Sequence, residues 1–217
     1  EKFLKNLLDP FLIIFLMHLE EFTIDEWLKR EISRQTLKFL LNNIGIFHEK
    51  VIGSVPGRER LEVGGVVDVI NKEKKIAAEI KNKFNTMKGD KKKNLRDDLY
   101  RWRQSNTDFT VYYVEILSKS KKQKVNWKPK GCDTPDDDKI IRINGKDFYS
   151  LVTGNPNAIY LLYKKVKEIL PDCIEMIAEH LKSSYLNLFG DLQEMLKDTN
   201  AEEDILDKIA MKSFQIE

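Results

Sequence analysis

The chain has 217 residues, 41% hydrophobic and 33% charged, which is the ordinary composition of a soluble globular protein. Its two Cys lie far apart and its three His are scattered, which excludes a zinc site and points to a reducing cytoplasm. The net charge of +2 hides a basic middle and an acidic end, a distribution typical of a nucleic-acid binder with a local contact surface.

The first fifty residues predict helices. Pro10 to Glu21 is apolar all round, which predicts a helix buried on most sides, and its core, Phe11 to Met17, is too short to cross a bilayer. Thr23 and Glu26 have the spacing of a capping box. The helical periodicity that follows ends at Gly45.

A loop punctuated by Gly and Pro, Val51 to Arg60, comes next. Arg58 and Arg60 stand just before the segment discussed below, where they either contact phosphate or are solvated loop charges. His48 is either close to a site or satisfied by local hydrogen bonds, and the second interpretation is favoured.

The segment Leu61 to Gly89 predicts a β-hairpin. Its first strand, its turn and its second strand are Leu61 to Ile70, Asn71 to Lys75, and Ile76 to Lys81. Because successive side chains of a strand point to opposite faces, Glu79 and Lys81 share one face. With the turn centred between residues 73 and 74, Asp68 lies directly opposite Glu79 on that face.

Two carboxylates and an ammonium on an otherwise apolar hairpin predict a metal site. Adjacent carboxylates repel, and a charge that leaves water costs several kcal/mol unless it is paired or bound to a metal. Oxygen ligands from Asp68 and Glu79 suit Mg²⁺, which stabilises charge on a phosphate under attack. Lys81 would orient or help deprotonate the attacking water. The alternative is a surface hairpin whose charges face solvent.

These residues resemble the motif of a known nuclease superfamily. Asp68, ten intervening residues and Glu79-Ile80-Lys81 resemble the PD-(D/E)xK motif, with Val67 in place of its Pro. The following run, Asn82 to Gly89 (NKFNTMKG), is similar to type II restriction endonucleases that recognise the interrupted site GGNCC. The resemblance covers residues from about Glu31 to Leu162.

The resemblance implies an α/β fold: a PD-(D/E)xK restriction-endonuclease-like core with a mixed β-sheet flanked by helices, and extra N- and C-terminal helices. It implies Mg²⁺-dependent hydrolysis of double-stranded DNA at a short palindromic site such as GGNCC, leaving 5′-phosphates. A homodimer is expected because protein symmetry mirrors site symmetry. A cognate DNA methyltransferase is expected in the same cell.

In this superfamily an acidic residue on a helix before the hairpin often adds a metal ligand. Glu31 is the first candidate, and Glu20 and Glu21 are lesser ones. The alternative is that Glu31 simply pairs with Arg34 or Gln35 on a wet helix face.

Basic and amide side chains after Lys81 are candidate DNA contacts. Asn85 suits adenine, and Lys83 and Lys88 suit guanine. The alternative for each is a phosphate contact or a structural hydrogen bond. Next, Asp90 to Gln104 predicts a crossover helix with Asp90 as its N-cap and with Lys91 to Lys93 and Arg96 on its charged side.

Phe109 to Leu117 predicts a central strand, which implies a right-handed crossover and a mixed sheet. The loop Lys119 to Asp138 holds six Lys. These lysines, with Trp127, predict a flexible arm that embraces DNA and orders on binding; its contacts would be Asn126, Lys128 and Lys130. The alternatives are a disordered surface loop or an insertion at a dimer boundary. Ile140 to Ile143 predicts another strand, followed by a turn at Asn144-Gly145.

We interpret residues 1–217 as a single nuclease domain, with N-terminal helices (1–50), a catalytic α/β core (51–145) carrying the Lys-rich loop 119–138, and C-terminal helices (146–217). The predicted C-terminal helices carry no visible chemistry; they are Asp147 to Val152, Asn157 to Leu170, Pro171 to Leu181, and Leu186 to Ala210. Competing functions are a structure-specific repair or recombination nuclease and a non-catalytic DNA-binding module. The run after Lys81 favours restriction, and the intact acid pair favours catalysis.

Overall fold

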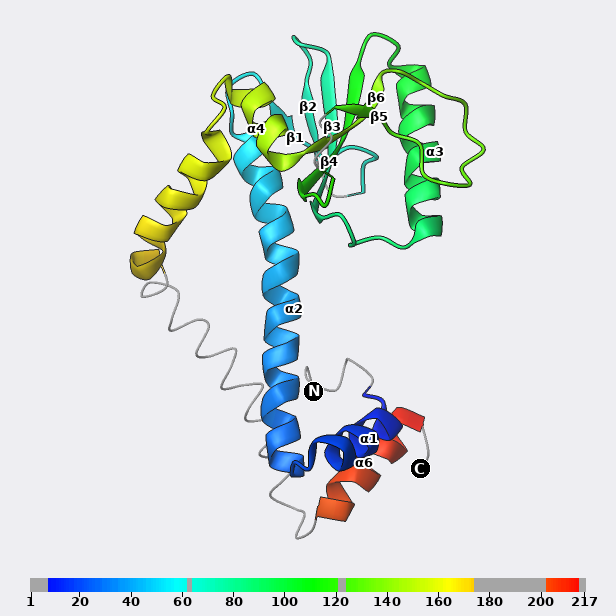
Figure 1. Ribbon diagram of the computed structural model, residues 1–217, viewed down its shortest axis with the longest axis vertical. Coiled ribbons are helices and arrows are strands. Elements are labelled where there is room, and N and C mark those ends of the chain that lie inside the picture. Colours follow the sequence, from blue (N-terminus) through cyan, green and yellow to red (C-terminus); the bar gives the residue numbers. More distant parts are fainter. Residues whose placement is uncertain (1–7, 62–63, 121–123, 174–201, 215–217) are drawn as a thin grey trace. The chain divides into compact units, whose positions relative to one another are not determined.

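The computed structural model describes residues 8–61, 64–120, 124–173 and 202–214 (Figure 1). The chain forms two compact units: the first is Glu1–Phe39 together with Glu168–Glu217, and the second is Leu40–Lys167. The helix α2 (Ile24–Gly53) contributes residues to both units. The interpretation as a single nuclease domain stays a prediction.

The first unit is helical. Its helix α1 (Pro10–Glu20) begins after Asp9, whose carboxylate accepts hydrogen bonds from two backbone N–H groups of the first turn. The predicted capping box of α2 is confirmed. The backbone N–H of Thr23 donates to the Glu26 carboxylate at 2.9 Å, and the N–H of Glu26 donates to the Thr23 hydroxyl at 3.4 Å.

The prediction that α1 is buried on most sides is wrong. Pro10 and Ile13 are its buried residues, and Ile13 packs in a core with α2 and α6 (Glu202–Phe214). Phe15 and Leu19 are 70% and 80% exposed. An apolar sequence favours burial of a helix, but the number of neighbours that cover it is decided by the rest of the fold.

The prediction that the second helix ends at Gly45 is also wrong, because α2 continues to Gly53. One interior Gly costs a helix only about 1 kcal/mol. Ile52 is fully buried in the core of the second unit. Burial of such a side chain contributes about 1.5–3 kcal/mol, which outweighs the cost of Gly45.

The second unit is built on a six-stranded sheet of order β1-β2-β3-β4-β6-β5. The strands are β1 (Glu59–Arg60), β2 (Val69–Asn71), β3 (Ile76–Lys83), β4 (Thr110–Leu117), β5 (Val125–Asn126) and β6 (Ile140–Asn144). The pairs β3–β4 and β4–β6 are parallel, and the other three are antiparallel. The chain therefore has the predicted α/β class with a mixed sheet flanked by helices.

Helices cover both faces of this sheet (Figure 1). The helix α4 (Gly145–Thr153) and the end of α2 pack on the face where Ile80 is buried. The crossover helix α3 (Gly89–Ser105) packs on the other face through Leu99, against Val111 of β4. The second face carries the site described below.

Strands β3, β4 and β6 confirm three predicted strands to within two residues. The predicted strand Leu61 to Ile70 is wrong, since only its end, in β2, pairs with β3. Gly64 lies within it at a φ of +104°, a backbone conformation that regular strands do not adopt.

The predicted turn at Asn144-Gly145 is instead the start of α4. The Asn144 side-chain oxygen caps this helix by accepting a hydrogen bond from the Asp147 N–H at 2.8 Å. A Cβ atom at Gly145 would lie 2.6 Å from the Ile116 carbonyl oxygen, so the close approach of α4 to β4 requires glycine there.

A further helix covers residues 158–173 and continues through residue 171, so the predicted restart at Pro171 is not seen. The rest of that predicted helix, and the start of the predicted helix Leu186 to Ala210, lie outside the described residues. Among the helices that the structure describes, none is both long and apolar enough to cross a membrane.

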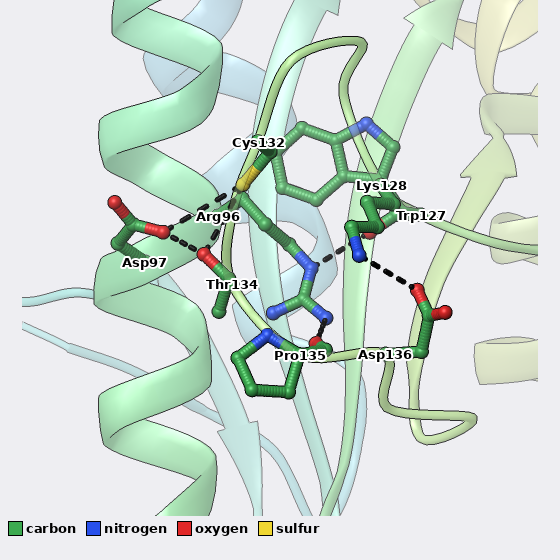
Figure 2. Close-up of polar contacts among 8 residues, drawn as sticks. All are labelled: Arg96, Asp97, Trp127, Lys128, Cys132, Thr134, Pro135 and Asp136. Carbon is green, nitrogen blue, oxygen red and sulfur yellow. Dashed lines mark hydrogen bonds and ion pairs between the residues drawn. The ribbon is translucent and has the colours of Figure 1, made fainter.

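Two predictions about α3 are wrong. Asp90 lies in the first turn, while Lys88 occupies the N-cap position and makes no side-chain capping bond. Arg96 is fully buried. Figure 2 shows its guanidinium inside the following loop, where Nε donates to the Trp127 carbonyl and Nη2 to the Pro135 carbonyl, each at 2.8 Å.

The predicted flexible arm is held against the rest of its unit over residues 124–138 by strand pairing, ring stacking and an ion pair. The strand β5 pairs with β6, and the buried Trp127 ring stacks on Tyr113 with centroids 3.9 Å apart. Lys128 pairs with Asp136 at 3.3 Å (Figure 2). A flexible arm is therefore wrong for this part of the loop, and its residues 121–123 lie outside the described residues.

Candidate functional site

The hairpin register brings the two predicted acids together. Val69 pairs with Ala78 and Asn71 with Ile76, so the turn is centred between residues 73 and 74, as predicted. The same register extends to Asp68, whose N–H donates to the Ala78 carbonyl at 2.8 Å. Asp68 therefore lies opposite Glu79 on one face of the sheet.

The three predicted side chains form one partly buried cluster. The Lys81 ammonium pairs with the Glu79 carboxylate, and their side chains are 28% and 9% exposed. The Asp68 carboxylate is half-buried and accepts a hydrogen bond from the Ile80 N–H at 2.7 Å. A backbone hydrogen bond of this kind fixes the position of the carboxylate without neutralising it.

Burial, and next the neighbouring Asp68 carboxylate, raise the pKa of Glu79 to about 8, against an opposing effect of Lys81. Burial lowers the pKa of Lys81, but the Glu79, Asp68 and Glu49 carboxylates outweigh it, so the net pKa is raised. When both carboxylates are deprotonated, the cluster holds more negative charge than Lys81 balances, which is the condition that favours a bound cation.

Glu49, near the end of α2, is an acid that the sequence analysis missed. Its carboxylate accepts a hydrogen bond from Arg60 at 2.9 Å and acts electrostatically on Lys81. A helix that ends at Gly45, as predicted, leaves Glu49 outside it. An acid close to the end of a helix that leads into the hairpin was the signal available.

Glu31 belongs to the other compact unit. Its buried carboxylate accepts hydrogen bonds from Arg34 and Gln35, which is the alternative that we stated for it. Its role as a metal ligand stays a prediction, as do the lesser candidates Glu20 and Glu21.

The other predicted side chains are distributed as follows. Asn85, Lys88, Asn126, Lys128 and Lys130 are exposed, and Lys83, Arg58 and Arg60 are partly buried. The Nε and Nη2 atoms of Arg58 are buried without a hydrogen-bond partner among the described residues. His48 forms a hydrogen bond with the Tyr149 hydroxyl of α4 at 2.9 Å, so its partner is distant in the sequence rather than local. The roles of the others as DNA contacts stay predictions.

Three further polar residues on the same sheet face were also missed: Tyr113, Glu115 and Arg142. In the parallel register Tyr113 pairs with Glu79 and with Arg142, and Glu115 pairs with Lys81. Glu115 and Arg142 are charged residues inside otherwise apolar strands, and that was the available signal. Burial, with the Glu115 and Glu79 carboxylates, raises the pKa of Tyr113.

The donor set fits magnesium better than a metal that needs a dedicated cage. No group of three or more His, Cys, Asp or Glu side chains arranged to hold a metal occurs in the part of the chain that the structure describes. Mg²⁺ is commonly held by one or two carboxylates, with water and phosphate oxygens completing its shell. Asp68 and Glu79 supply that number of carboxylates.

Most of the sequence matches a known family. A family model described as Eco47II restriction endonuclease matches residues 1–178. The chain belongs to the Eco47II restriction endonuclease family. It is therefore a type II restriction endonuclease, a site-specific deoxyribonuclease, which confirms the resemblance seen in the sequence.

Two curated relatives support membership of the Eco47II family. The chain is 36% identical to the type II restriction enzyme Eco47II of Escherichia coli, over 87% of this chain and 84% of the relative. It is 33% identical to the type II restriction enzyme Sau96I of Staphylococcus aureus, over 92% of this chain and 79% of the relative. No solved structure matches.

Proposed function

We propose that this member of the Eco47II family cuts double-stranded DNA at GGNCC in a Mg²⁺-dependent reaction that leaves 5′-phosphates. The observation that carries the proposal is the cluster of Asp68, Glu79 and Lys81, with its buried and incompletely balanced carboxylates. The choice of GGNCC rests on the resemblance of the run Asn82 to Gly89.

Asp68 and Glu79 would hold the metal. When bound, Mg²⁺ stabilises negative charge on the phosphate and makes water a better nucleophile. Lys81 keeps its proton in the metal-free cluster, since its pKa is raised, and its ammonium would donate a hydrogen bond to a reacting oxygen. In-line attack of water on phosphorus expels the 3′ oxygen and leaves the 5′-phosphate.

We further propose Glu49 as a helical acid that acts on this cluster, because it acts electrostatically on Lys81. A homodimer follows from the two-fold symmetry of the proposed site. A cognate DNA methyltransferase in the same cell would protect the host genome. The free thiols of Cys132 and Cys173 are consistent with a reducing cytoplasm.

Digestion of a fully sequenced plasmid with the purified protein tests this function. We expect discrete fragments whose ends map to GGNCC in Mg²⁺ and no cleavage in EDTA. The variants Asp68→Ala, Glu79→Ala and Lys81→Ala should each lower cleavage by at least about 100-fold while retaining DNA in a gel shift.

Asp108→Ala and Lys72→Ala are matched controls, because these exposed side chains pair with Lys75 and Glu59 away from the acid cluster. Both controls should cut like the unchanged protein. Smeared products or cleavage of junctions alone would replace the proposal with a structure-specific nuclease. A salt-sensitive gel shift with no cleavage in any divalent metal would leave a DNA-binding module.

A further inference from the structure

A pocket of about 260 Å³ opens beside the acid cluster. Its lining side chains are Phe84, Lys92, Glu115, Lys119, Ser120 and Arg142. They come from the end of β3, from α3, from β4 and the residues after it, and from β6. The proposed hydrolysis uses none of them.

The sheet register fixes the position of this pocket relative to the cluster. Glu115 is the Cα partner of Lys81, and Arg142 is the Cα partner of Tyr113, which itself pairs with Glu79. Neighbouring strands lie about 4.8 Å apart. The pocket therefore begins one strand from Lys81 on the same face, so a DNA strand whose phosphate lies at the cluster would carry its next nucleotides over the pocket.

The pocket holds a hydrogen-bond donor, Arg142, and a hydrogen-bond acceptor, Glu115, and each can form further hydrogen bonds. Glu115 is 4% exposed, and its carboxylate accepts a hydrogen bond from Ser118 at 2.9 Å. The Arg142 side chain is half-buried and forms no ion pair or hydrogen bond within the described ranges. Tyr113, the residue that pairs with both Glu79 and Arg142, is buried, and it interacts with the Glu115 carboxylate.

This combination suits a base edge better than a phosphate. A phosphate pocket needs donors and cations, and a buried carboxylate at its wall would repel the ligand. Arginine donates two hydrogen bonds to O6 and N7 of guanine, and a carboxylate accepts one from the N4 amino group of cytosine. Phe84, which is 38% exposed, adds an apolar edge.

We propose that Arg142 and Glu115 read a G·C base pair next to the scissile phosphate, with Arg142 donating to guanine and Glu115 accepting from the cytosine amino group. This proposal rests on the proposed function, because it assumes that the acid cluster holds the scissile phosphate. Under this proposal, side chains of the sheet recognise DNA bases, in addition to the segment Asn82 to Gly89 that follows Lys81.

Equilibrium binding to modified duplexes tests the guanine contact. Duplexes that carry the cleavage site mapped on the plasmid are made with 7-deazaguanine, which lacks the N7 acceptor, at each guanine in turn. Binding is measured without Mg²⁺ so that no cleavage occurs. We expect one substitution to weaken binding of the unchanged protein by about 5- to 150-fold, and binding of Arg142→Ala by no more than about twofold.

Three further variants keep the test decisive. Arg142→Lys retains the charge but not the bidentate geometry, so it should behave like Arg142→Ala toward the modified guanine. Arg101→Ala removes an exposed arginine that pairs with Asp98, and it should keep the full response. Thermal unfolding of each variant shows which ones are folded. Glu115→Ala, which removes the acceptor, should lose discrimination against a duplex in which 2-pyrimidinone, which lacks the amino group, replaces cytosine.

The outcomes separate this proposal from the proposed function. If the unchanged protein cuts a defined site but responds to no modified guanine, or if folded Arg142→Ala keeps the full response, the base-reading pocket is wrong and the nuclease stands. A uniform loss for Arg142→Ala on every sequence, with a salt slope smaller by about one, would make Arg142 a phosphate contact and also overturn the pocket. If the plasmid digestion gave no cleavage at a defined site, the proposed function would be wrong, and the base-reading pocket, which rests on it, would be wrong as well.

Discussion

At the scale of single residues, folding buries the acid cluster and so disfavours the charged form of Glu79. Glu79 is buried beside Asp68, and the neighbouring Lys81 ammonium does not keep the pKa of Glu79 from rising to about 8. A carboxylate in this state binds a proton or a divalent cation more tightly than a solvated one. The local cost in stability and the capacity to bind a metal thus have the same cause.

This cause predicts the pH dependence of stability in EDTA. Between about 4.5 and 8 the Asp68–Glu79 pair binds more protons in the folded chain than in the unfolded chain, because the folded pKa of Glu79 is raised. Its contribution to the free energy of unfolding is therefore fully present below pH 4.5 and is lost as the pH rises to about 8. Urea unfolding of the unchanged protein and of Glu79→Gln, from pH 5 to pH 8.5, measures this contribution as the difference between the two.

Mg²⁺ should counteract this loss, because it binds the deprotonated pair. The increase in thermal midpoint caused by Mg²⁺ should be larger at pH 8.5 than at pH 6 and absent in Glu79→Gln. Asp108→Asn, on an exposed carboxylate, is the control and should respond like the unchanged protein. In the urea experiment without metal, a free energy of unfolding that rises with pH for the unchanged protein relative to Glu79→Gln would contradict the raised pKa.

At the scale of elements, the segment after β5 is held by α3. Arg96 donates to two carbonyl groups of this segment, and Trp127 stacks on Tyr113 in the core (Figure 2). The Thr134 hydroxyl donates to the Asp97 carboxylate, which adds a further tie to α3. The exposed Asn126 and Lys130 are therefore presented from a fixed segment, which lowers the entropy that binding through them would cost.

Removal of the Arg96 side chain should release this segment. Arg96→Ala loses two hydrogen bonds from a charged donor and leaves a buried gap, so we expect it to destabilise the protein by about 3 kcal/mol. Residues 127–136 should also become sensitive to limited proteolysis. Urea unfolding and mass mapping of the cleavage sites measure both effects. Arg101→Ala, on the exposed face of α3, should change stability by less than about 0.5 kcal/mol, and an equal effect of both variants would contradict the anchoring role.

At the scale of the whole molecule, DNA binding is expected to depend on local basic residues, because the net charge is only +2. Lys88 and Lys130 are exposed and make no ion pair with the residues that the structure describes. Lys128 is partly neutralised by Asp136. The predicted phosphate contacts therefore differ in how much charge they offer to DNA.

This difference predicts a graded salt dependence. Lys88→Ala and Lys130→Ala should each reduce the slope of log K against log salt by about one, because each phosphate contact releases about one counterion. Lys128→Ala should reduce the slope less. Titration of a labelled duplex at several salt concentrations measures these slopes, and Lys72→Ala is the control. Unchanged slopes for Lys88→Ala and Lys130→Ala would place the DNA on another surface.

The sequence alone determined the hairpin, its register and the acid cluster. Strand alternation and the position of the turn are local properties, and they place Asp68 opposite Glu79 without reference to the rest of the chain. The capping box at Thr23 is local for the same reason. The α/β class also followed from local patterns, because hairpin, helix and strand occur in that order.

Only the tertiary structure decided which residues join the cluster from elsewhere. Glu115 and Arg142 become neighbours of the acids through parallel strand pairing, whose register depends on a crossover rather than on local sequence. Arg96 is buried because two carbonyl groups thirty or more positions away receive its donors. Glu49 reaches the cluster because Ile52 packs in the core and carries α2 past Gly45. For α2 these distant contacts outweigh the local cost of Gly45, about 1 kcal/mol, and in every case periodicity in the sequence does not report them.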